Sequence, residues 1–488
     1  MKLSKLLKPL EIKEIIGNAN LEISNITQNS LEVTKNSLFF AIKGNNLDGN
    51  DYLNEAIEKG AIAIVTNTPK KVNVTQVIVN DVRDCISKIT YEFFSLSKIN
   101  MKFIGVVGTN GKTTTSYVLR SILLKAGKKV GIIGTSGVIY GKKNVSADLT
   151  TPDSISLGEI ISDMNKDGIE YVVMELSAHA IEQKRADFIK FESLIFTNCT
   201  EDHLDYFLDI NEYANVKKSV FLNKKCKFAV VNVDDKVGLS LINTKNLNAY
   251  TYGIENPSDV FSIDVKNVDD GVIFDMNLFD EILNLKFSLI GRFNVYNCMA
   301  AATVAYKLGI GINDIKEGIE GLKCVDGRME FVEKFNGAKI FIDYAHTPDG
   351  LENTLKELKK ITDKKLIVLF GCGGNREKEK RAKMGIIAGK YADFSIITTD
   401  NPRFEEPFTI IKEIESGIRT VSLNYITIQN RYIATGYALE MLEKGDTLLL
   451  AGKGAECYQD IMGVKSKYSD KDTVMDIISK IRLSGELI

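Results

Sequence analysis

Short apolar runs, each followed by a polar loop that often carries glycine, recur along the whole chain. Such runs, rich in Val, Ile and Phe, are typical of buried strands, and the longer amphipathic stretches between them are typical of helices. Near the N-terminus the pattern predicts strands over 37–43, 61–65 and 76–79, a polar loop over 45–51, and a helix over 52–59 that Gly60 ends. These elements form a small α/β module.

The middle of the chain alternates strands with helices, which favours a mostly parallel sheet. We expect a helix over 117–126 and strands over 103–107, 130–133, 171–174, 194–196 and 228–231. After these elements apolar and polar residues alternate instead, which indicates a small antiparallel insertion. Its strands are expected over 261–265, 272–276 and 285–289, before an alanine-rich helix over 299–308.

Further apolar runs predict a second open α/β sheet, with strands over 338–342, 366–370, 394–398 and 447–450. A chain of 488 residues is too long for one core. We therefore predict an α/β fold of three domains. They are a small N-terminal α/β domain over 1–100, a central, mostly parallel phosphate-loop-type sheet with helices over 101–328, and a C-terminal Rossmann-like α/β domain over 329–488.

Composition narrows the class of protein. The formal net charge of −2 gives no general affinity for polyanions, so nucleic acid is not an expected partner. Seven cysteines without C-x-x-C pairs suit a reducing compartment. The N-terminus lacks the uninterrupted apolar core of a signal peptide, and no stretch approaches the roughly eighteen apolar residues of a spanning helix. A cytoplasmic enzyme, active as a monomer, is the expectation.

The stretch MKFIGVVGTNGKTTT, residues 101–115, predicts a nucleotide site. Gly108 and Gly111 let the backbone approach a ligand, and Thr113 lies at a helix start that favours an anion. Lys112 adds a charge suited to phosphate, and the Thr113 hydroxyl suits Mg²⁺. The common phosphate-loop pattern would place its first glycine at Val106, so this loop is a variant; the alternative is a turn that binds nothing.

Polar residues gather where the predicted strands end. Glu175 and Ser177 follow one strand and His203 follows another, and ligands of parallel sheets collect at this edge. Thr113, Glu175 and His203 are suitable Mg²⁺ ligands, His203 either directly or through water. Arg328 is placed to reach phosphate; a solvated surface charge is its alternative.

The C-terminal domain supplies a different chemistry. Arginine binds carboxylate through two parallel hydrogen bonds, and an acidic neighbour binds an ammonium group. An amino-acid pocket needs both, and a surface ion-pair network is the alternative explanation. The residues concerned are Arg376, Asp400, Asn401, Arg403 and Glu456.

Taken together, these segments resemble the Mur ligases, the ATP-dependent peptide ligases of peptidoglycan precursor synthesis, and within them the MurE type. The resemblance follows the family's order across nearly the whole chain. Its segments are GTNGKTTT (108–115), TTPDS (150–154), ELSAHAIEQKR (175–185), TNCTEDHLDYF (197–207), YANVKKSVF (213–221), GRFNVYN (291–297), GRME (327–330), DYAHTPDGLENTL (343–355), GCGGNREKEKR (371–381), DNPRFEEP (400–407) and GKGAECYQ (452–459).

The resemblance implies that the first domain holds the UDP end of a substrate, the second ATP and the third an incoming amino acid. It implies that a D-Glu carboxylate of UDP-MurNAc-L-Ala-D-Glu attacks the γ-phosphate of ATP, and that the amine of a diamino acid attacks the acyl phosphate. Such a reaction depends on positioning and on charge neutralisation by Mg²⁺ and cations. It places the chain in cell wall biogenesis, and hence in cell shape, division and the cell cycle.

The resemblance also implies roles for particular residues. Lys112, Glu175, His203 and Lys217 are the expected catalytic residues, with Lys217 a carbamylated lysine (N6-carboxylysine) that ligates Mg²⁺ beside Thr113, Glu175 and His203. For ATP the residues are Gly108, Thr109, Asn110, Gly111, Lys112, Thr113, Thr114, Asn294, Asn297, Arg328 and Asp343. For the UDP-MurNAc dipeptide they are Ser30, Thr150, Thr151, Ser177, Gln183 and Arg185. For the diamino acid they are Arg376, Asp400, Asn401, Pro402, Arg403, Gly452 and Glu456.

The D-N-P-R segment resembles that of enzymes that add meso-2,6-diaminopimelate. This amino acid carries a second carboxylate that lysine lacks, and Arg403 can pair with it. Two departures from the family pattern leave L-lysine or lanthionine open. Ala455 precedes Glu456 where the family often has histidine, and the family's D-S-R reads Asn29-Ser30-Leu31 here.

Two other classes are alternatives. A folylpolyglutamate-synthase-like ligase shares the ATP loop, but D-N-P-R suits a diamino acid better than glutamate. A non-catalytic nucleotide-binding regulator predicts gaps among the metal ligands, whereas Thr113, Glu175, His203 and Lys217 are all present.

Overall fold

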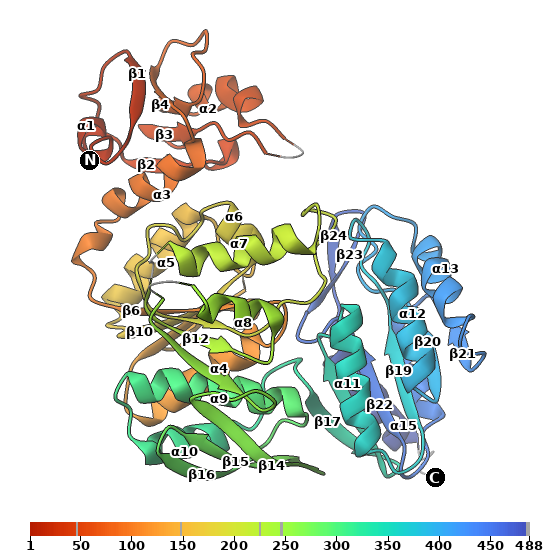
Figure 1. Cartoon of the computed structure of the whole chain (residues 1–488). Coiled ribbons are helices and arrows are strands. Elements are labelled where there is room, and N and C mark those ends of the chain that lie inside the picture. Colours follow the sequence, from red (N-terminus) through yellow and green to blue (C-terminus); the bar gives the residue numbers. More distant parts are fainter. Residues whose placement is uncertain (45–46, 147–148, 224–225, 245–246, 485–488) are drawn as a thin grey trace. The chain divides into compact units, whose positions relative to one another are not determined.

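The computed structural model of the protein describes residues 1–44, 47–146, 149–223, 226–244 and 247–484. Residues 45 and 46 of the loop predicted over 45–51 lie outside them. Figure 1 labels the helices and strands of the chain. The chain forms two compact units. The first comprises Met1–Gly105, Lys128–Leu194 and Ser219–Lys227, and the second comprises Val106–Gly127, Ile195–Lys218 and Phe228–Ile488.

The N-terminal part of the first unit is built on a five-stranded sheet of order β1-β5-β4-β3-β2. Its strands are β1 (Ile12–Ile16), β2 (Asn25–Thr27), β3 (Ser37–Phe40), β4 (Ala61–Thr66) and β5 (Thr75–Val79). Neighbours are parallel except β1 and β5. The accompanying helices are α1 (Leu3–Leu6), η1 (Ser30–Glu32), η2 (Gly49–Tyr52), α2 (Leu53–Glu58), α3 (Val82–Phe93) and η3 (Leu96–Lys98). The predicted module is therefore present.

The largest sheet has the strand order β16-β15-β14-β13-β12-β11-β6-β10-β7-β8-β9. Strands β6, β11 and β12 each contribute residues to both units. Its strands are β6 (Lys102–Val107), β7 (Val130–Gly134), β8 (Gly137–Tyr140), β9 (Lys143–Val145), β10 (Tyr171–Leu176), β11 (Phe191–Phe196), β12 (Cys226–Asn232), β13 (Ala249–Gly253), β14 (Val260–Val268), β15 (Gly271–Leu278) and β16 (Glu281–Phe287).

The sequence pattern predicted the antiparallel part of this sheet at β14–β16, but not the antiparallel pairs β7–β8 and β8–β9 at the other end. Strands β7 and β10 are parallel, whereas β14, β15 and β16 form an antiparallel meander. The helices between these strands are α4 (Lys112–Lys125), α5 (Ser154–Lys166), α6 (Ala178–Glu182), α7 (Ile210–Leu222) and α8 (Lys236–Ile242), and α9 (Arg292–Lys307) and α10 (Ile312–Gly321) follow β16.

The C-terminal part of the second unit has a six-stranded sheet of order β17-β18-β22-β19-β20-β21, and a separate hairpin of β23 and β24. Its pairings are parallel except the edge pair of β17 and β18. The strands are β17 (Glu330–Phe335), β18 (Ala338–Asp343), β19 (Leu366–Phe370), β20 (Phe394–Ile397), β21 (Tyr425–Thr427), β22 (Thr447–Ala451), β23 (Tyr458–Ile461) and β24 (Val464–Lys467). The helices are α11 (Pro348–Lys360), α12 (Glu379–Tyr391), α13 (Pro407–Ile418), α14 (Arg431–Glu440) and α15 (Asp470–Ser484).

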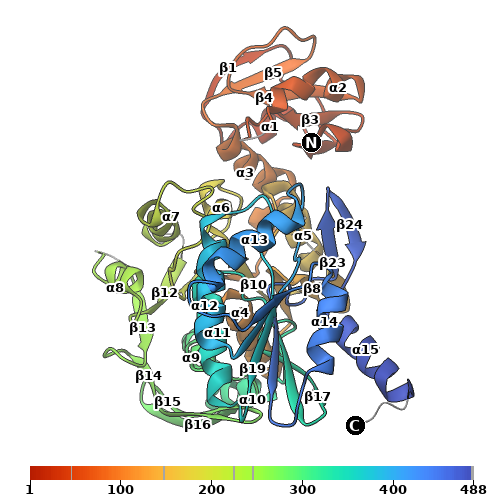
Figure 2. The ribbon, with the colours of Figure 1, turned by 90° about the vertical axis from the view of Figure 1, so that its right-hand side faces the viewer.

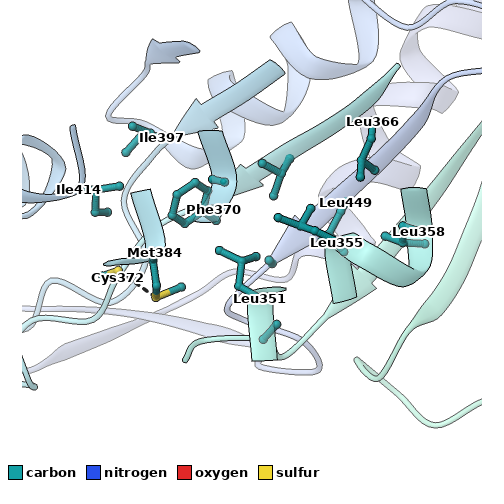
Figure 3. Packing of buried hydrophobic residues seen from close by; sticks show 14 of the residues in the cluster. Leu351, Leu355, Leu358, Leu366, Phe370, Cys372, Met384, Ile397, Ile414 and Leu449 are labelled. Atoms are coloured by element: carbon teal, nitrogen blue, oxygen red, sulfur yellow. Dashed lines mark hydrogen bonds between the residues drawn. The ribbon is translucent and has the colours of Figure 1, made fainter. Parts of the chain in front are cut away.

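Helices cover both faces of this sheet (Figure 2). Val368 and Phe370 of β19 face the core under α11, α12 and α13, whereas Ile367 and Leu369 face α14 and α15. Successive strand residues point to opposite faces, so burial on both faces explains the continuous apolar run. Figure 3 shows the first of these cores, where Cys372 Sγ lies 3.6 Å from Met384 Sδ.

The predicted α/β architecture with three domains is confirmed by these sheets. The exact boundaries after residues 100 and 328 stay predictions, because the compact units divide the chain elsewhere. In the part of the chain that the structure describes, no helix is both long and apolar enough to cross a membrane.

Candidate functional site

The glycine loop between β6 and α4 has the backbone that an anion site needs. Gly111 precedes the helix with φ +84° and, as a glycine, supplies no side-chain cap. A Cβ on Gly108 would lie 1.8 Å from Thr197 Oγ1, and one on Gly111 would lie 2.5 Å from Asn297 Oδ1. Only glycine fits at both positions, and the first N–H groups of α4 are left for a ligand.

Asn110 anchors this loop to two neighbouring segments. Its backbone N–H donates to Asn198 Oδ1 at 2.9 Å, and its carbonyl accepts from Thr197 Oγ1 at 2.7 Å. Its side-chain amide donates to Asp349 Oδ2 at 2.9 Å, and Asp349 opens α11 in the C-terminal domain. Two segments that are distant in the sequence, at 197–198 and at Asp349, therefore hold the loop in shape.

Lys112 and Thr113 begin α4. The Lys112 ammonium donates to the carbonyls of Gly108 and Thr109, both at 2.9 Å, so it lies over the loop itself. The Thr113 hydroxyl is buried and accepts from Arg328 Nη2 at 2.9 Å. Arg328 thus reaches the start of α4, and its contact with phosphate stays a prediction.

Asp343, Asn294 and Asn297 have their polar atoms occupied within the protein. Asp343 accepts from Met329 N at 2.6 Å and from Ala345 N at 2.9 Å, and burial raises its pKa. Asn297 accepts from Thr115 Oγ1 at 3.1 Å and donates to Asn294 Oδ1 at 2.9 Å. These contacts position the turn before β17 and the start of α4, and a direct contact of these three side chains with the nucleotide stays a prediction.

Lys217, on α7, is almost completely buried, with 1% of its surface exposed. Its ammonium nitrogen lies 2.6 Å from Thr109 Oγ1, 3.8 Å from Cys199 Sγ and 3.8 Å from the centre of the Tyr213 ring. Burial lowers its pKa to about 7, although the Cys199 thiol acts in the opposite direction. At neutral pH about half of such an amine is therefore uncharged and nucleophilic.

His203 lies in the left-handed region, with φ +59°, directly after a buried acid that sequence reasoning missed. Its Nε2 is 3.4 Å from Asp202 Oδ2, and its backbone N–H donates to Asp202 Oδ1 at 2.9 Å. Burial opposes ionisation of Asp202, but His203 and His346 outweigh it and lower the pKa of this carboxyl. Asp202 therefore orients His203, and its place in the segment TEDH was the available signal.

Glu175, in the first unit, is the second-last residue of the fully buried strand β10. Thr135 donates to it twice, from its backbone N–H to Oε1 and from its hydroxyl to Oε2, both at 3.1 Å. A Cβ on Gly134 would lie 2.2 Å from Glu175 Oε1, so the glycine leaves room for the carboxylate. Sequence reasoning missed Thr135, which lies in a loop after β7.

The residues expected to contact the muramoyl dipeptide form one network in the first unit. The Thr151 hydroxyl donates to Glu175 O at 2.7 Å and accepts from Ser177 N at 3.1 Å. Arg185 Nη1 donates to Thr151 O at 2.8 Å. The remaining members are Thr150, 3.1 Å from Thr135 Oγ1, and Gln183, which accepts from Arg185.

Ser30 is separate from this network. It lies in η1, is buried, and donates from its hydroxyl to Glu55 Oε2 at 2.8 Å. Hydrogen bonds from Lys59 and then Ser30 lower the pKa of Glu55. Asn29, at the position of the family's acid, caps η1 by accepting from Leu31 N at 3.0 Å.

The loops at the ends of β20 and β22 meet around a lysine that sequence reasoning did not single out. Lys453 is completely buried, and its ammonium lies 3.0 Å from Asn401 Oδ1, 3.2 Å from Glu456 Oε2 and 3.4 Å from Asp400 Oδ1. Asn401 Nδ2 donates to Glu456 Oε2 at 2.8 Å. The available signal for Lys453 in the sequence was its place between two glycines, in the segment GKG.

These charges shift the two carboxyls in opposite directions. Burial, and then the nearby Asp400 charge, raise the pKa of Glu456. Burial also opposes ionisation of Asp400, but Lys453 and Arg431 outweigh it and lower its pKa. Gly452, with φ +107°, lies so close that a Cβ there would be 2.8 Å from Asp400 Oδ2.

Arg403, in the loop after β20, extends over the glycine-rich loop after β19. Its Nη1 donates to Gly374 O at 2.7 Å and is the atom that a Cβ on Gly373 would meet at 2.9 Å. The same Cβ would lie 3.7 Å from Arg376 Cγ, so the predicted arginines both flank this loop. A Cβ on Gly374 would lie 1.9 Å from Pro402 O, which requires glycine there.

The predicted metal ligands are divided between the units. Glu175 belongs to the first, whereas Thr113, His203 and Lys217 belong to the second. Among the described residues, no group of three His, Cys, Asp or Glu side chains could hold a metal ion. The Mg²⁺ site therefore stays a prediction.

The glycine loop after β6 and the charged cluster around Lys453 lie at strand ends of two different sheets, within the same compact unit. The chain belongs to the Mur ligase family. The model of the Mur ligase family catalytic domain matches residues 22–94, that of the middle domain 106–305, and that of the Mur ligase glutamate ligase domain 327–454.

Relatives match over the full length. The UDP-N-acetylmuramoyl-L-alanyl-D-glutamate–2,6-diaminopimelate ligase of Caldanaerobacter subterraneus subsp. tengcongensis is 40% identical, over 98% of this chain and 99% of that protein. A solved structure of a ligase with the same name has a TM-score of 0.70 and 27% identity, over 99% of both chains. The MurF ligase of Thermotoga maritima in complex with ADP has a TM-score of 0.64 and 22% identity, over 94% of this chain and 98% of that one, and shares the fold.

Proposed function

We propose that this chain is an ATP-dependent ligase that adds 2,6-diaminopimelate to UDP-MurNAc-L-Ala-D-Glu in peptidoglycan precursor synthesis. One observation carries the proposal: the same compact unit contains both the Gly108–Gly111 loop and the loops that hold Arg403, Lys453 and Glu456. Full-length relatives of that name support it. We expect the enzyme to be a cytoplasmic monomer.

The reaction has two steps. The D-Glu carboxylate attacks the γ-phosphorus of ATP, and the bond to the β-phosphate oxygen breaks to release ADP. The amine of the diamino acid then attacks the acyl carbon, loses a proton, and phosphate leaves. Lys112, Arg328 and the N–H groups at the start of α4 neutralise charge on the phosphates, which is where most of the acceleration of phosphoryl transfer arises.

Thr113, His203 and Lys217, all in the second unit, suit Mg²⁺ by their chemistry, since they offer a hydroxyl, an imidazole and, on Lys217, a carbamate oxygen. Mg²⁺, when bound, neutralises charge on the phosphate oxygens. Lys217 fits only as a carbamate, because an ammonium repels a cation. Its buried amine, with its pKa of about 7, can attack CO₂ and release a proton to form that carbamate.

The dipeptide end of the UDP substrate is assigned to the network of Thr150, Thr151, Ser177, Gln183 and Arg185. Arg185 supplies a cation next to the Thr151 backbone, which suits a carboxylate of the substrate. Ser30 is assigned to the uridine end. Its hydroxyl is already bound to Glu55, so this contact would need the hydroxyl to accept a hydrogen bond as well.

Arg403 selects the diamino acid. A guanidinium over the Gly373–Gly374 backbone can pair with the distal carboxylate of diaminopimelate, which lysine lacks. Leaving Arg403 without that partner would cost about 1–3 kcal/mol, or roughly a tenfold to hundredfold preference. Glu456 and Asp400 supply the opposite charge for an ammonium group.

The test is ADP release from purified protein supplied with ATP, UDP-MurNAc-L-Ala-D-Glu and one amino acid. We expect release with meso-diaminopimelate, and much less with L-lysine, lanthionine or L-glutamate. Arg403→Ala should lower the preference for diaminopimelate over lysine about tenfold or more, whereas Arg419→Ala, a surface arginine, should not. Equal use of glutamate, or release that needs glutamyl-folate in place of the UDP substrate, would overturn the assignment.

A further inference from the structure

Arg381, on α12, is an arginine that the proposed reaction does not use and that is completely buried. Its guanidinium forms two parallel hydrogen bonds with Glu405, from Nη1 to Oε2 and from Nη2 to Oε1, both at 2.9 Å. The same guanidinium donates to Glu413 Oε2 at 2.5 Å and to Gly373 O at 3.2 Å. A buried charge is costly unless it is paired in this way, so the arrangement needs a reason.

The reason lies in which segments these contacts join. Glu405 lies two residues after Arg403, and Gly373 belongs to the loop that Arg403 lies over. Glu405 Oε1 also accepts from Asn375 N at 2.5 Å, and Asn375 Oδ1 accepts from Phe404 N at 3.0 Å. Arg381 therefore ties the loop after β19 to the loop after β20.

The backbone of Arg403 needs such support. It adopts φ +50°, in the left-handed region that a residue with a Cβ enters only at a cost. On its other side it is bound to the hairpin of β23 and β24, where its N–H donates to Asp460 O at 3.0 Å and its carbonyl accepts from Met462 N at 2.7 Å. A conformation of this kind persists only where the surroundings over-determine it.

We propose that Arg381 is a positioning residue for amino-acid selection, because its pair with Glu405 holds Arg403 in the strained conformation that aims the guanidinium over Gly374. This inference rests on the proposed function for its substrate. Arg381 touches no reacting atom; it acts through Glu405 and the two loops. The pKa of Glu405 is lowered, most of all by the hydrogen bond from Arg381, which agrees with a tight ion pair.

Glu413 offers a matched control. It binds the same guanidinium, but it lies on α13, outside both loops. Glu405→Gln and Glu413→Gln each remove one negative charge from Arg381 while keeping the size of the side chain. Only the first weakens the link to the loop that carries Arg403.

The experiment compares these two variants with the wild-type enzyme in steady-state kinetics. For Glu405→Gln we expect KM for diaminopimelate to rise about tenfold and the preference over lysine to fall about tenfold, with KM for ATP within about twofold. Glu413→Gln should stay within about twofold in every constant. Arg381→Lys should resemble Glu405→Gln, because an ammonium cannot form the two parallel bonds.

Amide hydrogen exchange of the same proteins gives a readout that does not depend on the reaction. Glu405→Gln should speed exchange in peptides covering 373–376 and 400–406, and Glu413→Gln should not. Equal kinetics and equal exchange in the two variants would overturn the inference. A wild-type enzyme that uses no diamino acid would overturn the proposed function instead, while exchange would still decide whether the pair of Arg381 and Glu405 holds the two loops together. Should Glu405→Gln not fold, Asn375→Gly takes its place, because it removes the hydrogen bond from Phe404 N and tolerates the φ of +51° at this position.

Discussion

Two buried lysines in the same compact unit have opposite surroundings. Lys217 lies against a hydroxyl, a thiol and an aromatic ring, whereas Lys453 lies among two carboxylates and an amide oxygen. Each has almost no exposed surface. The pKa of Lys217 falls to about 7, because burial penalises its charge more than its neighbours stabilise it.

The difference teaches how one residue type serves two purposes. A buried amine among neutral groups is partly uncharged near neutral pH and can react, for instance with CO₂. A buried ammonium that contacts carboxylates cross-links them, and it holds Asp400 and Glu456 within reach of one another. Burial alone therefore does not indicate the role of a lysine; the charges of its neighbours do.

The largest effect is expected from Lys217→Met. Loss of the proposed carbamate oxygen should lower ADP release by about 10³-fold or more, since it removes the Mg²⁺ ligand proposed above. Lys218→Met, at the next and less buried position, is the control and should keep most of the activity. Lys217→Ala should regain part of its activity in acetate. Full activity of the methionine variant would refute the carbamate.

A smaller effect is expected from Lys453→Met, which leaves Asp400 and Glu456 close together without their cation. We expect kcat/KM for the amino acid to fall about 10²-fold and the free energy of unfolding to fall by about 3 kcal/mol. Urea denaturation measures the second change. Adding Glu456→Gln should restore part of the stability because it removes one of the two uncompensated charges. No change in either quantity would show that Lys453 is not the cross-link.

Cys199→Asp would convert the surroundings of Lys217 into those of Lys453. In the wild type, Cys199 Sγ lies 3.8 Å from the Lys217 ammonium. A carboxylate in the place of this thiol should return the pKa of Lys217 toward its usual value. The carbamate signal from ¹³CO₂ in NMR spectra, and ADP release, should then fall about tenfold at pH 7. Cys199→Ser keeps a neutral neighbour and should change neither. An unchanged carbamate signal in Cys199→Asp would contradict the comparison.

The last prediction concerns the free energy of unfolding as a function of pH in CO₂-free buffer. The pKa of Lys217 is about 7 in the folded protein against a usual 10.5, so between these values the unfolded state binds more protons at this site. The free energy of unfolding should therefore rise with pH above about 7, as Lys217 loses its proton. Below about pH 7, Lys217 is charged in the folded protein, and the full cost of burying that charge lowers the stability.

Lys217→Met lacks this titration and serves as the reference. Its advantage in unfolding free energy over the wild type should shrink by about 2 kcal/mol between pH 7 and pH 9, as measured by urea denaturation. A constant difference over this range would mean that Lys217 titrates normally in the folded protein.

The buried strands were well predicted. The runs at 366–370 and 394–398 became β19 and β20 because continuous apolar segments of that length are buried on both faces of a parallel sheet. The hairpin of β23 and β24 was not predicted. Val464–Lys467 is exposed throughout, so its sequence has no pattern of apolar residues that would predict a strand. The backbone hydrogen bonds between the hairpin and Arg403 join distant segments and cannot be predicted from the local sequence.

The site was predicted in part. The segments that carry Lys112, Glu175 and Arg403 were proposed as site segments because ligands of parallel sheets collect where the strands end. Lys453 and Arg381 were not singled out, since a lysine or arginine in a polar segment is normally solvated. Their burial follows from partners that lie 52 and 24 residues away, at Asn401 and Glu405.

By itself, the amino-acid sequence determined the order of strands and helices, the loops at which chemistry collects, and the resemblance to the Mur ligases. These features are local, because apolar periodicity and glycine conformations act over a few residues. Only the tertiary structure decided that Lys217 is buried among neutral groups, that Lys453 is buried among acids, and that Arg381 binds the loop of Arg403. The physical reason is that solvation and neighbouring charges determine whether a side chain is ionised and what it binds, and those neighbours come from distant parts of the chain.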